Sequence, residues 1–353
     1  MTTTRLKAAG SLAKKTPAKK VVPKVAPKVA PKSPQVFKLA KAADTTPAAV
    51  LQAAPAALRL FQVNAAPAVQ VDTAFESYAL PTTASSLPLI DGMRQLSCDP
   101  VVQASALWGM MPQDFTQRTG LTGDALREAI MARPGYDLYF CHAHPELEAT
   151  YHNPWLQAEV SHPNFVLLAS AFLKAADLPE APLYMLTHSA LFATGHLLVA
   201  SPAFWTAYMA FIDHTLSQAK ATLGKTARIA LFEEQPQPGQ FSYLYLIVAR
   251  LIGFVIGSKN QTWRACKLPL PPETSLNPHL RLLRELKDTA IVQQSRWLTA
   301  CWGNYRALYL AHTLGKTWLS SHLAAISPKT LQMGQPPVGI DYAYPPTMAG
   351  QNP

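Results

Sequence analysis

Short apolar runs of strand length alternate with amphipathic stretches of helical period along most of this chain. The runs "ALRLFQVN" (57–64) and "YDLYFC" (136–141) are bounded by polar or turn-forming residues, which is typical of buried strands. Between them, "ASALWGMM" (104–111) is another short apolar run, whereas "LPLIDGM" (87–93) is interpreted as a turn at Asp91-Gly92. Strands that alternate with helices predict an α/β layered fold.

Several helices follow from the 3.6-residue period and from residues that favour helix ends. Thr122 is placed to cap a helix that Pro134-Gly135 stops, and 162–179 is amphipathic, with Pro163 in its first turn. Leu197 to Val199 predicts a strand, and Ser201-Pro202 then opens a helix whose aromatic stripe suits core packing. The pattern from 278 to about 325 is helical again.

The longest apolar run is "FSYLYLIVARLIGFVIG" (241–257), which has 17 residues and carries Arg250 inside it. A bilayer span needs about 20 apolar residues. A central arginine costs about 2.5–3.5 kcal/mol even on the lenient insertion scale. The run therefore favours a buried helix over a membrane span, and no transmembrane segment is expected.

Composition divides the chain into three parts. Residues 1–56 form a Lys/Pro/Ala-rich tail and linker that can bury almost no apolar surface, so disorder is expected there. Residues 57–326 are expected to form the α/β domain with its C-terminal helices, and 327–353 a Pro/Gly-rich irregular tail. The hydrophobic share of 49% suits a folded globular protein.

The formal charge of +10 is unevenly distributed. Residues 1–41 contain 11 of the 31 basic residues and no acid, which leaves 20 basic against 21 acidic residues, a balance of −1, in the remainder. The tail is thus a polycation on a nearly neutral body. It would suit nucleic acid or an anionic membrane, or it would act as a tether with no particular partner.

Four scattered cysteines without a C-x-x-C pair, and no apolar signal core near the start, favour a reducing interior with free thiols. A cytoplasmic location is expected, and peripheral attachment to the inner membrane is the alternative. The chain has no G-x-S-x-G, Walker A or G-x-G-x-x-G motif, so serine hydrolase and P-loop chemistry lose their support.

The segment "YDLYFCHAHPELEATYHN" (136–153) concentrates imidazoles and carboxylates directly after a predicted strand. Alternate side chains of a strand share one face, so His142 and His144 could bind one metal ion together. Pro145 shows that the strand has already ended, and a polar loop at a strand end is the alternative. If a metal binds, His142 and His144 are the expected ligands.

A second candidate lies before the helix at 162–179, where Glu159 and His162 precede the apolar period. Free N–H groups at a helix N-terminus attract anions such as phosphate, and His162 would add a donor that titrates near neutral pH. The alternative is that these residues simply cap the helix.

Several segments carry a family resemblance. "ALWGMMPQDFTQRTG", "YDLYFCHAHP" and "WLQAEVSHP" resemble segments of bacterial glycosyltransferase-like proteins of surface-polysaccharide gene clusters, which are distantly similar to putative polysaccharide glycosyltransferase domains of GT-A type. The resemblance covers roughly residues 58–257. Its matching positions are Trp108, Gly109, Phe115, Thr119, Gly120, Tyr136, Asp137, Tyr139, Phe140, Pro145, Trp155, Gln157, Glu159, His162, Pro163, Phe204 and Trp205.

The resemblance implies a GT-A-like twisted, mostly parallel sheet flanked by helices, with a nucleotide-sugar donor at the carboxyl ends of the strands. It also implies a divalent metal, Mn²⁺ or Mg²⁺, held by an Asp-x-Asp pair, where this chain has His142-x-His144 instead. This chain departs from the pattern at two further positions. Ala158 stands in place of a glycine, and Ala249 stands before Arg250 in place of a glutamate.

Two functions follow as hypotheses. The first is transfer of a sugar from a nucleotide-sugar donor to a glycan acceptor in cell-surface polysaccharide assembly. Glu159 would act as the catalytic base, Trp108, Asp137, His162 and Arg250 would bind substrate, and His142 and His144 would bind metal or phosphate. The alternative interpretation of Arg250 is a buried structural residue. The other function is a non-catalytic protein that binds nucleic acid or an anionic membrane through its basic N-terminal arm.

Overall fold

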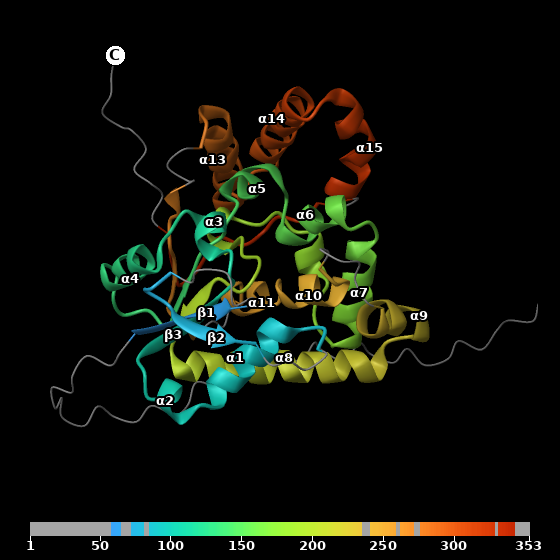
Figure 1. Cartoon of the computed structure of the whole chain (residues 1–353). Coiled ribbons are helices and arrows are strands. Elements are labelled where there is room, and N and C mark those ends of the chain that lie inside the picture. The colour runs from blue at the N-terminus through green and yellow to red at the C-terminus, as the bar shows by residue number, and fades with distance from the viewer. Residues whose placement is uncertain are drawn as a thin grey trace, which may run out of the picture. The chain divides into compact units, whose positions relative to one another are not determined.

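The structure is a computed structural model, and it describes residues 58–64, 72–80, 85–234, 241–258, 262–271, 276–328 and 331–342. The predicted disordered tail at 1–56 lies outside these residues. Within them, the chain is a mixed α/β protein with a mostly parallel sheet of seven strands (Figure 1). The strands are β1 (Leu58–Asn64), β2 (Glu76–Ala79), β3 (Leu107–Met111), β4 (Leu138–Phe140), β5 (Leu198–Ala200), β6 (Ala265–Lys267) and β7 (Ile340–Tyr342).

The strand order is β2-β1-β3-β5-β4-β6-β7. Every pairing is parallel except those of β5, which runs antiparallel to both β3 and β4. The carboxyl ends of β3 and β4 therefore meet the amino end of β5 at one edge of the sheet. Residues that follow β3 and β4 and residues that precede β5 are brought together there.

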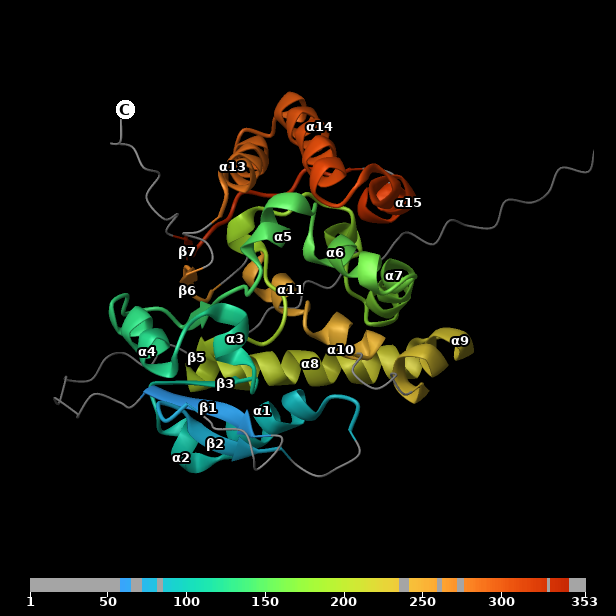
Figure 2. The same ribbon diagram turned by 45° about the horizontal axis from the view of Figure 1, so that its top comes forward.

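Helices flank the sheet. They are α1 (Pro88–Cys98), α2 (Pro100–Gln103), α3 (Phe115–Thr119), α4 (Gly123–Met131), α5 (Pro145–Thr150), α6 (Pro154–Ser161), α7 (Phe165–Ala175), α8 (Pro202–Thr222), α9 (Lys225–Arg228), α10 (Tyr243–Val248), α11 (Ile252–Ile256), α13 (Pro278–Val292), α14 (Arg296–Thr313) and α15 (Lys316–Ile326). The helices α13, α14 and α15 pack over α5 and α6 (Figure 2). None of the described helices is long and apolar enough to cross a membrane.

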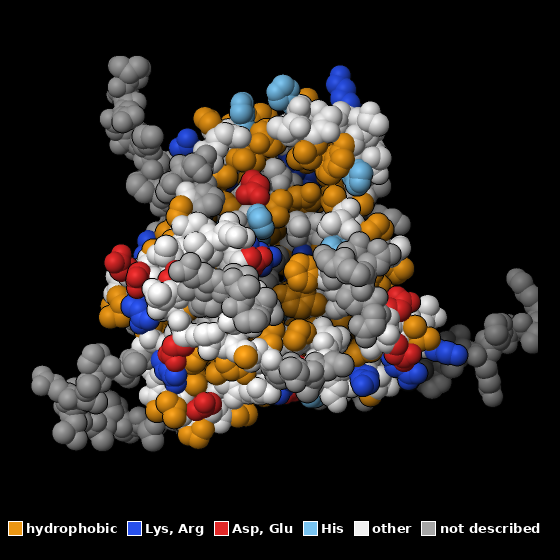
Figure 3. Space-filling view, in the orientation of Figure 1, with side chains coloured by type: hydrophobic (Ala, Val, Ile, Leu, Met, Phe, Trp, Pro, Cys, Tyr) orange, Lys and Arg blue, Asp and Glu red, His pale blue; other side chains and the backbone are white. Residues whose placement is uncertain are grey.

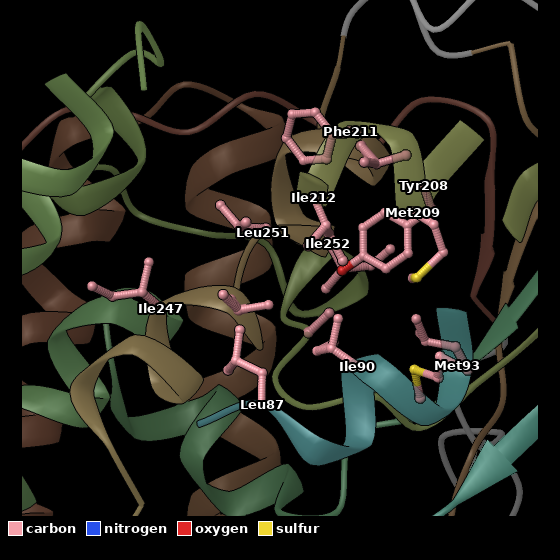
Figure 4. Close-up of a cluster of buried hydrophobic side chains, with 14 of the residues drawn as sticks. Leu87, Ile90, Met93, Tyr208, Met209, Phe211, Ile212, Ile247, Leu251 and Ile252 are labelled. Atoms are coloured by element: carbon pink, nitrogen blue, oxygen red, sulfur yellow. The ribbon is translucent and has the colours of Figure 1, made fainter. Parts of the chain in front are cut away.

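Side chains alternate between the two faces of the sheet, and each face has its own core. Trp108 and Met110 of β3 belong to the larger core, to which α1, α6, α7, α8, α10 and α11 contribute. Met111 belongs to the smaller core under α3 and α4. Figure 4 shows part of the larger core, where apolar side chains of α1, α8 and α11 meet.

The helix α1 corrects the turn expected at 87–93. Pro88 occupies the first helical position, where a missing N–H costs nothing, so the Asp-Gly pair falls inside a helix. Ile90 and Met93 are fully buried against α8 (Figure 4). Burial of one helix face thus outweighs the local preference of Asp91-Gly92 for a turn.

Two further expectations on local structure need correction. The apolar run at 241–257 is two short helices, α10 and α11, separated by a turn at 249–251 rather than one helix. The C-terminal tail, expected to be irregular throughout, contributes β7 to the edge of the sheet beside β6. The predicted elements at 57–64, 123–131, 136–141 and after Ser201-Pro202 are confirmed as β1, α4, β4 and α8. No disulfide joins the four cysteines.

The C-terminal helices are fixed to the α/β body through the end of α5. Lys287 of α13 donates from Nζ to the carbonyl oxygen of Glu148, and Trp302 of α14 donates from Nε1 to that of Ala149 at 3.0 Å. Lys287 is fully buried, and burial lowers its pKa to about 8. Since α5 directly follows the loop that carries His144, these contacts also hold that loop in place.

Candidate functional site

A cleft of about 210 Å³ lies at the edge of the sheet where β3 and β4 end and β5 begins. Pro112 follows β3, Ala143 and His144 follow β4, and residues 194–197 lead into β5. Residues of the helices α6 and α10 also line the cleft. Ligands of open α/β sheets bind beyond the carboxyl ends of the strands, which is the position of this cleft.

The polar lining of the cleft is basic or neutral. On the face shown in Figure 3, basic and acidic side chains are interspersed, but among the described residues no carboxylate lines the cleft. Its polar side chains are those of Arg118, His144, Gln157, Ser161, His162, Thr194, His196, Tyr245 and Arg250. A cleft with this lining favours an anionic ligand over a cationic one.

Arg250 is the most buried cation of the cleft, with 4% of its surface exposed. Its guanidinium donates to the carbonyl oxygens of Pro154 and Leu246, both at 2.8 Å, and to the side-chain oxygen of Gln157 at 2.9 Å. All three acceptors are neutral, so its charge is not balanced by these contacts. Burial accordingly lowers the pKa of Arg250 to about 9.

His196 is buried in the same cleft, with 2% of its surface exposed. Neither ring nitrogen has a hydrogen-bond partner among the described residues. The ring meets that of Tyr245 edge-on, with 6.0 Å between the centroids. Burial lowers the pKa of His196 to about 4, so at neutral pH the ring is uncharged and offers one N–H donor and one acceptor.

His162 ends α6 at the rim of the cleft. Its Nδ1 lies 2.9 Å from the hydroxyl of Ser161, and its ring meets Tyr243 edge-on. Burial, and then the charge of Arg250, lower the pKa of His162. Of the residues predicted to bind substrate or metal, His144, His162 and Arg250 therefore share one cleft.

His142 and His144, the predicted metal ligands, lie near each other, with 6.3 Å between their ring centroids, but their surroundings differ. His142 is buried, and its Nδ1 lies 3.1 Å from the carboxylate of Glu148, whereas His144 is half exposed beside Glu146. The strand ends at Phe140, so the alternation of strand side chains does not extend to these two residues. The described residues hold no group of three or more His, Cys, Asp or Glu that could bind a metal ion. A complete ligand set for the divalent cation that the resemblance implies is therefore not found among the described residues, and the metal-binding role of His142 and His144 remains a prediction.

Glu159 lies outside the cleft and caps the next helix. Its carboxylate oxygens accept the backbone N–H groups of Asn164 at 2.8 Å and Val166 at 2.6 Å. These N–H groups lie at the start of α7, and they are the groups that were predicted to bind a phosphate. Of the two interpretations of this segment, the geometry supports helix capping.

We expect Glu159→Ala to lower the free energy of unfolding by about 0.5–2 kcal/mol, the usual effect of losing an N-terminal cap. Glu128→Ala, an exposed position on α4, is the control and should change it by less than about 0.5 kcal/mol. Urea unfolding measures both variants. If Glu159→Ala instead kept full stability and lost turnover of a sugar donor, the result would contradict the capping role and support the catalytic role expected for Glu159.

Trp108 and Asp137 also lie away from the cleft. Trp108 is fully buried and stacks on Trp205, with ring centroids 4.5 Å apart. Asp137 precedes β4, at the end opposite to the cleft, where its carboxylate accepts the backbone N–H of Arg264 at 2.9 Å. Neither side chain lines the cleft, and the substrate-binding role expected for both remains a prediction.

The cleft also contains residues that the sequence did not single out for binding, namely Arg118, His196 and Tyr245. His196 stands just before β5, and only the antiparallel direction of that strand brings it beside the end of β4. In the sequence, the only indication of a binding role for His196 was its position at the start of an apolar strand, and a histidine in that position more often packs in the core.

The structure is that of a mixed α/β protein with a cleft of basic and neutral polar lining at one edge of its sheet. Comparisons with protein-family models, with curated proteins and with solved structures find no match to this chain.

Proposed function

We propose that this protein is a glycosyltransferase-like protein that takes a nucleotide-sugar donor into the cleft and acts in cell-surface polysaccharide assembly. The observation that carries the proposal is the cleft itself, which is lined by two arginines and three histidines and lies beyond the carboxyl ends of β3 and β4. Departure of a nucleoside diphosphate from the sugar develops negative charge, which fixed cations stabilise.

The resemblance supports this proposal in a specific way. Its segments at 136–145 and 155–163 are separate in the sequence, yet they contribute His144, Gln157 and His162 to one cleft. The apolar segment at 241–257 adds Arg250 to the same place. A GT-A-like identity of the sheet belongs to this proposal, as does a cytoplasmic location, with or without peripheral attachment to the inner membrane.

The size of the cleft limits what it can hold. Clefts for drug-sized ligands measure about 300–1,000 Å³, and this one is smaller, at about 210 Å³. It suits the diphosphate of a donor better than the whole donor. The base for the glycan acceptor would be His162 rather than Glu159, because a neutral imidazole at the rim can accept a proton.

The proposal is tested by thermal unfolding of the full chain with a panel of nucleotide-diphosphate sugars, with Mn²⁺ and without it. A donor present at 100 times its Kd should stabilise the fold by about 2.7 kcal/mol, a shift of several degrees. Transfer to glycan acceptors is then assayed with the stabilising donor. A panel in which no donor raises the unfolding temperature would count against the proposal.

A second candidate function rests on the charge of the N-terminal arm, which holds 11 of the 31 basic residues within residues 1–41. In this candidate the arm docks the protein on nucleic acid or on an anionic membrane. Cosedimentation of the full chain with DNA or with anionic vesicles should then weaken steeply as salt rises, and deletion of 1–41 should abolish it. Equal binding by the shortened chain would remove this candidate.

A further inference from the structure

We propose that Arg250, His196 and Gln157 form a phosphate subsite in the buried wall of the cleft, which holds the diphosphate of a nucleotide directly rather than through a divalent metal. This inference deepens the proposed function and rests on it for the identity of the ligand. Four features of the cleft support this subsite, namely the charge of Arg250, the ring of His196, the position of Gln157 and the lack of carboxylates in the described lining.

Arg250 carries the charge that an anion would balance. A buried cation without an acidic partner is unfavourable, and the guanidinium here bonds only neutral oxygens. Its five N–H groups make three hydrogen bonds within the described residues, so two donors remain. Guanidinium donors match the spacing of phosphate oxygens, and such charge-assisted bonds are stronger than neutral ones.

His196 provides an independent observation. A buried imidazole with two unpartnered nitrogens is exceptional, because buried polar groups nearly always have hydrogen-bond partners. The ring lines the same cleft as Arg250, so its N–H can donate to a phosphate oxygen there. A bound phosphate would satisfy this donor and would raise the low pKa of His196 at the same time.

Gln157 connects the two parts of the subsite. Its side-chain oxygen accepts a hydrogen bond from Nη2 of Arg250, which fixes the direction of the guanidinium. The amide NH₂ group of Gln157 has no acceptor among the described residues, so it can donate to a ligand. Gln157 also lines the cleft. The buried wall therefore presents donors from three side chains.

The lining is unsuited to a bridging divalent cation. Mg²⁺ sites normally include carboxylate oxygens, and no described carboxylate lines the cleft. The acids next to lining residues already face cations or imidazoles, since Asp114 pairs with Arg118 at 3.6 Å and Glu146 lies 3.3 Å from His144. A divalent cation would be repelled by Arg250, whose charge has no acidic partner in its hydrogen bonds, whereas a diphosphate would be attracted.

The test is isothermal titration of the full chain with inorganic pyrophosphate and with UDP, in EDTA and again with Mn²⁺. Both ligands should bind in EDTA, and Mn²⁺ should change Kd by less than about threefold. Arg250→Gln and His196→Gln should each weaken binding by about tenfold or more, the loss of roughly one charge-assisted hydrogen bond. His196→Gln keeps the experiment decisive if Arg250→Gln does not fold.

Arg306→Gln is the matched control. Arg306 is as buried as Arg250 and likewise bonds neutral partners, His152 and Ser327, but it lies outside the cleft. It should lower stability and leave Kd within about twofold of the wild-type value, because it provides no ligand contact. Equal weakening by Arg306→Gln and Arg250→Gln would show a structural effect and overturn the subsite.

The remaining outcomes separate this inference from the proposed function. Nucleotide sugars that bind with Mn²⁺ and not in EDTA would overturn the subsite and leave the proposed function standing. Pyrophosphate that binds in EDTA, with no nucleotide sugar binding under either condition, would support the subsite and overturn the proposed function. If neither pyrophosphate nor UDP binds in EDTA, the subsite is wrong.

Discussion

Lys267→Met is expected to lower the free energy of unfolding by about 3–5 kcal/mol, as removal of one partner from a buried ion pair usually does. Lys267 of β6 is fully buried, and its Nζ donates to the carboxylate of Glu148 at 2.5 Å and to the carbonyl oxygen of Ser189 at 2.7 Å. Without the ammonium, a buried carboxylate loses its counter-charge.

The pKa of Glu148 shows how the pair works. Burial by itself would raise this pKa, but the charge of Lys267 and the interaction with His142 outweigh burial and hold it below its usual range. Glu148 is thus charged because Lys267 is present. Loss of Lys267 would leave either a bare buried carboxylate or one that must take up a proton.

Urea unfolding of the single variant and of the double variant Glu148→Gln, Lys267→Met measures this effect. The double variant should lose less stability than Lys267→Met alone, because it leaves no buried charge unpaired. A loss below about 1 kcal/mol for Lys267→Met would contradict the buried ion pair. Since α5 is fixed at this point, the same variant should also weaken ligand binding in the cleft.

Acidification from pH 7 to pH 4 is expected to destabilise the protein strongly, with His196 alone contributing about 3 kcal/mol. The folded-state pKa of His196 is about 4, against an ordinary value of 6.5. Between these two values the unfolded chain binds a proton that the folded chain does not. Stability is therefore full above pH 6.5 and falls as the pH is lowered through this window.

Other buried histidines act in the same direction. Burial is the main cause that lowers the pKa of His142, His152 and His188, and these rings also protonate more readily once the chain unfolds. The loss of stability in acid should accordingly exceed the share of His196. Chemical unfolding at several pH values between 7 and 4 gives the slope of the unfolding free energy.

His196→Gln is the variant that isolates one group. It removes one titrating ring, so the slope between pH 4 and 6.5 should decrease by up to about 1.4 kcal/mol per pH unit, the equivalent of one proton. Gln218→Ala is the control, because Gln218 is an exposed residue of α8 without a titratable group, and the slope should stay unchanged. An unchanged slope in His196→Gln would contradict the burial of an unpaired neutral imidazole.

The sequence predicted most elements whose ends are marked by local chemistry. Thr122 caps α4 through the N–H of Ala125, and Ser201 caps α8 through that of Phe204, as their positions before an apolar period indicated. The failures came where distant contacts decide. α1 forms because its apolar face packs on α8, and β7 forms because β6 offers an edge. Neither partner is visible from a short window of sequence.

Three of the predicted site residues are brought together by the fold. His144, expected to bind metal or phosphate, lines the cleft with His162 and Arg250, expected to bind substrate, and these roles remain predictions. Trp108 and Asp137 came from the resemblance, and matching residue types do not distinguish a core residue from a binding residue. The strand alternation assumed for His142 ends at Phe140. His196 was missed because the reversal of β5 is a property of the topology.

The most direct test of the cationic cleft as a diphosphate site is a crystal structure of the full chain grown with UDP in EDTA. The diphosphate is expected beside β4 and α6, with its oxygens within hydrogen-bond distance of the guanidinium of Arg250 and the ring of His196. Density for the nucleotide at any other place, or a diphosphate in the cleft that contacts neither side chain, would contradict the account.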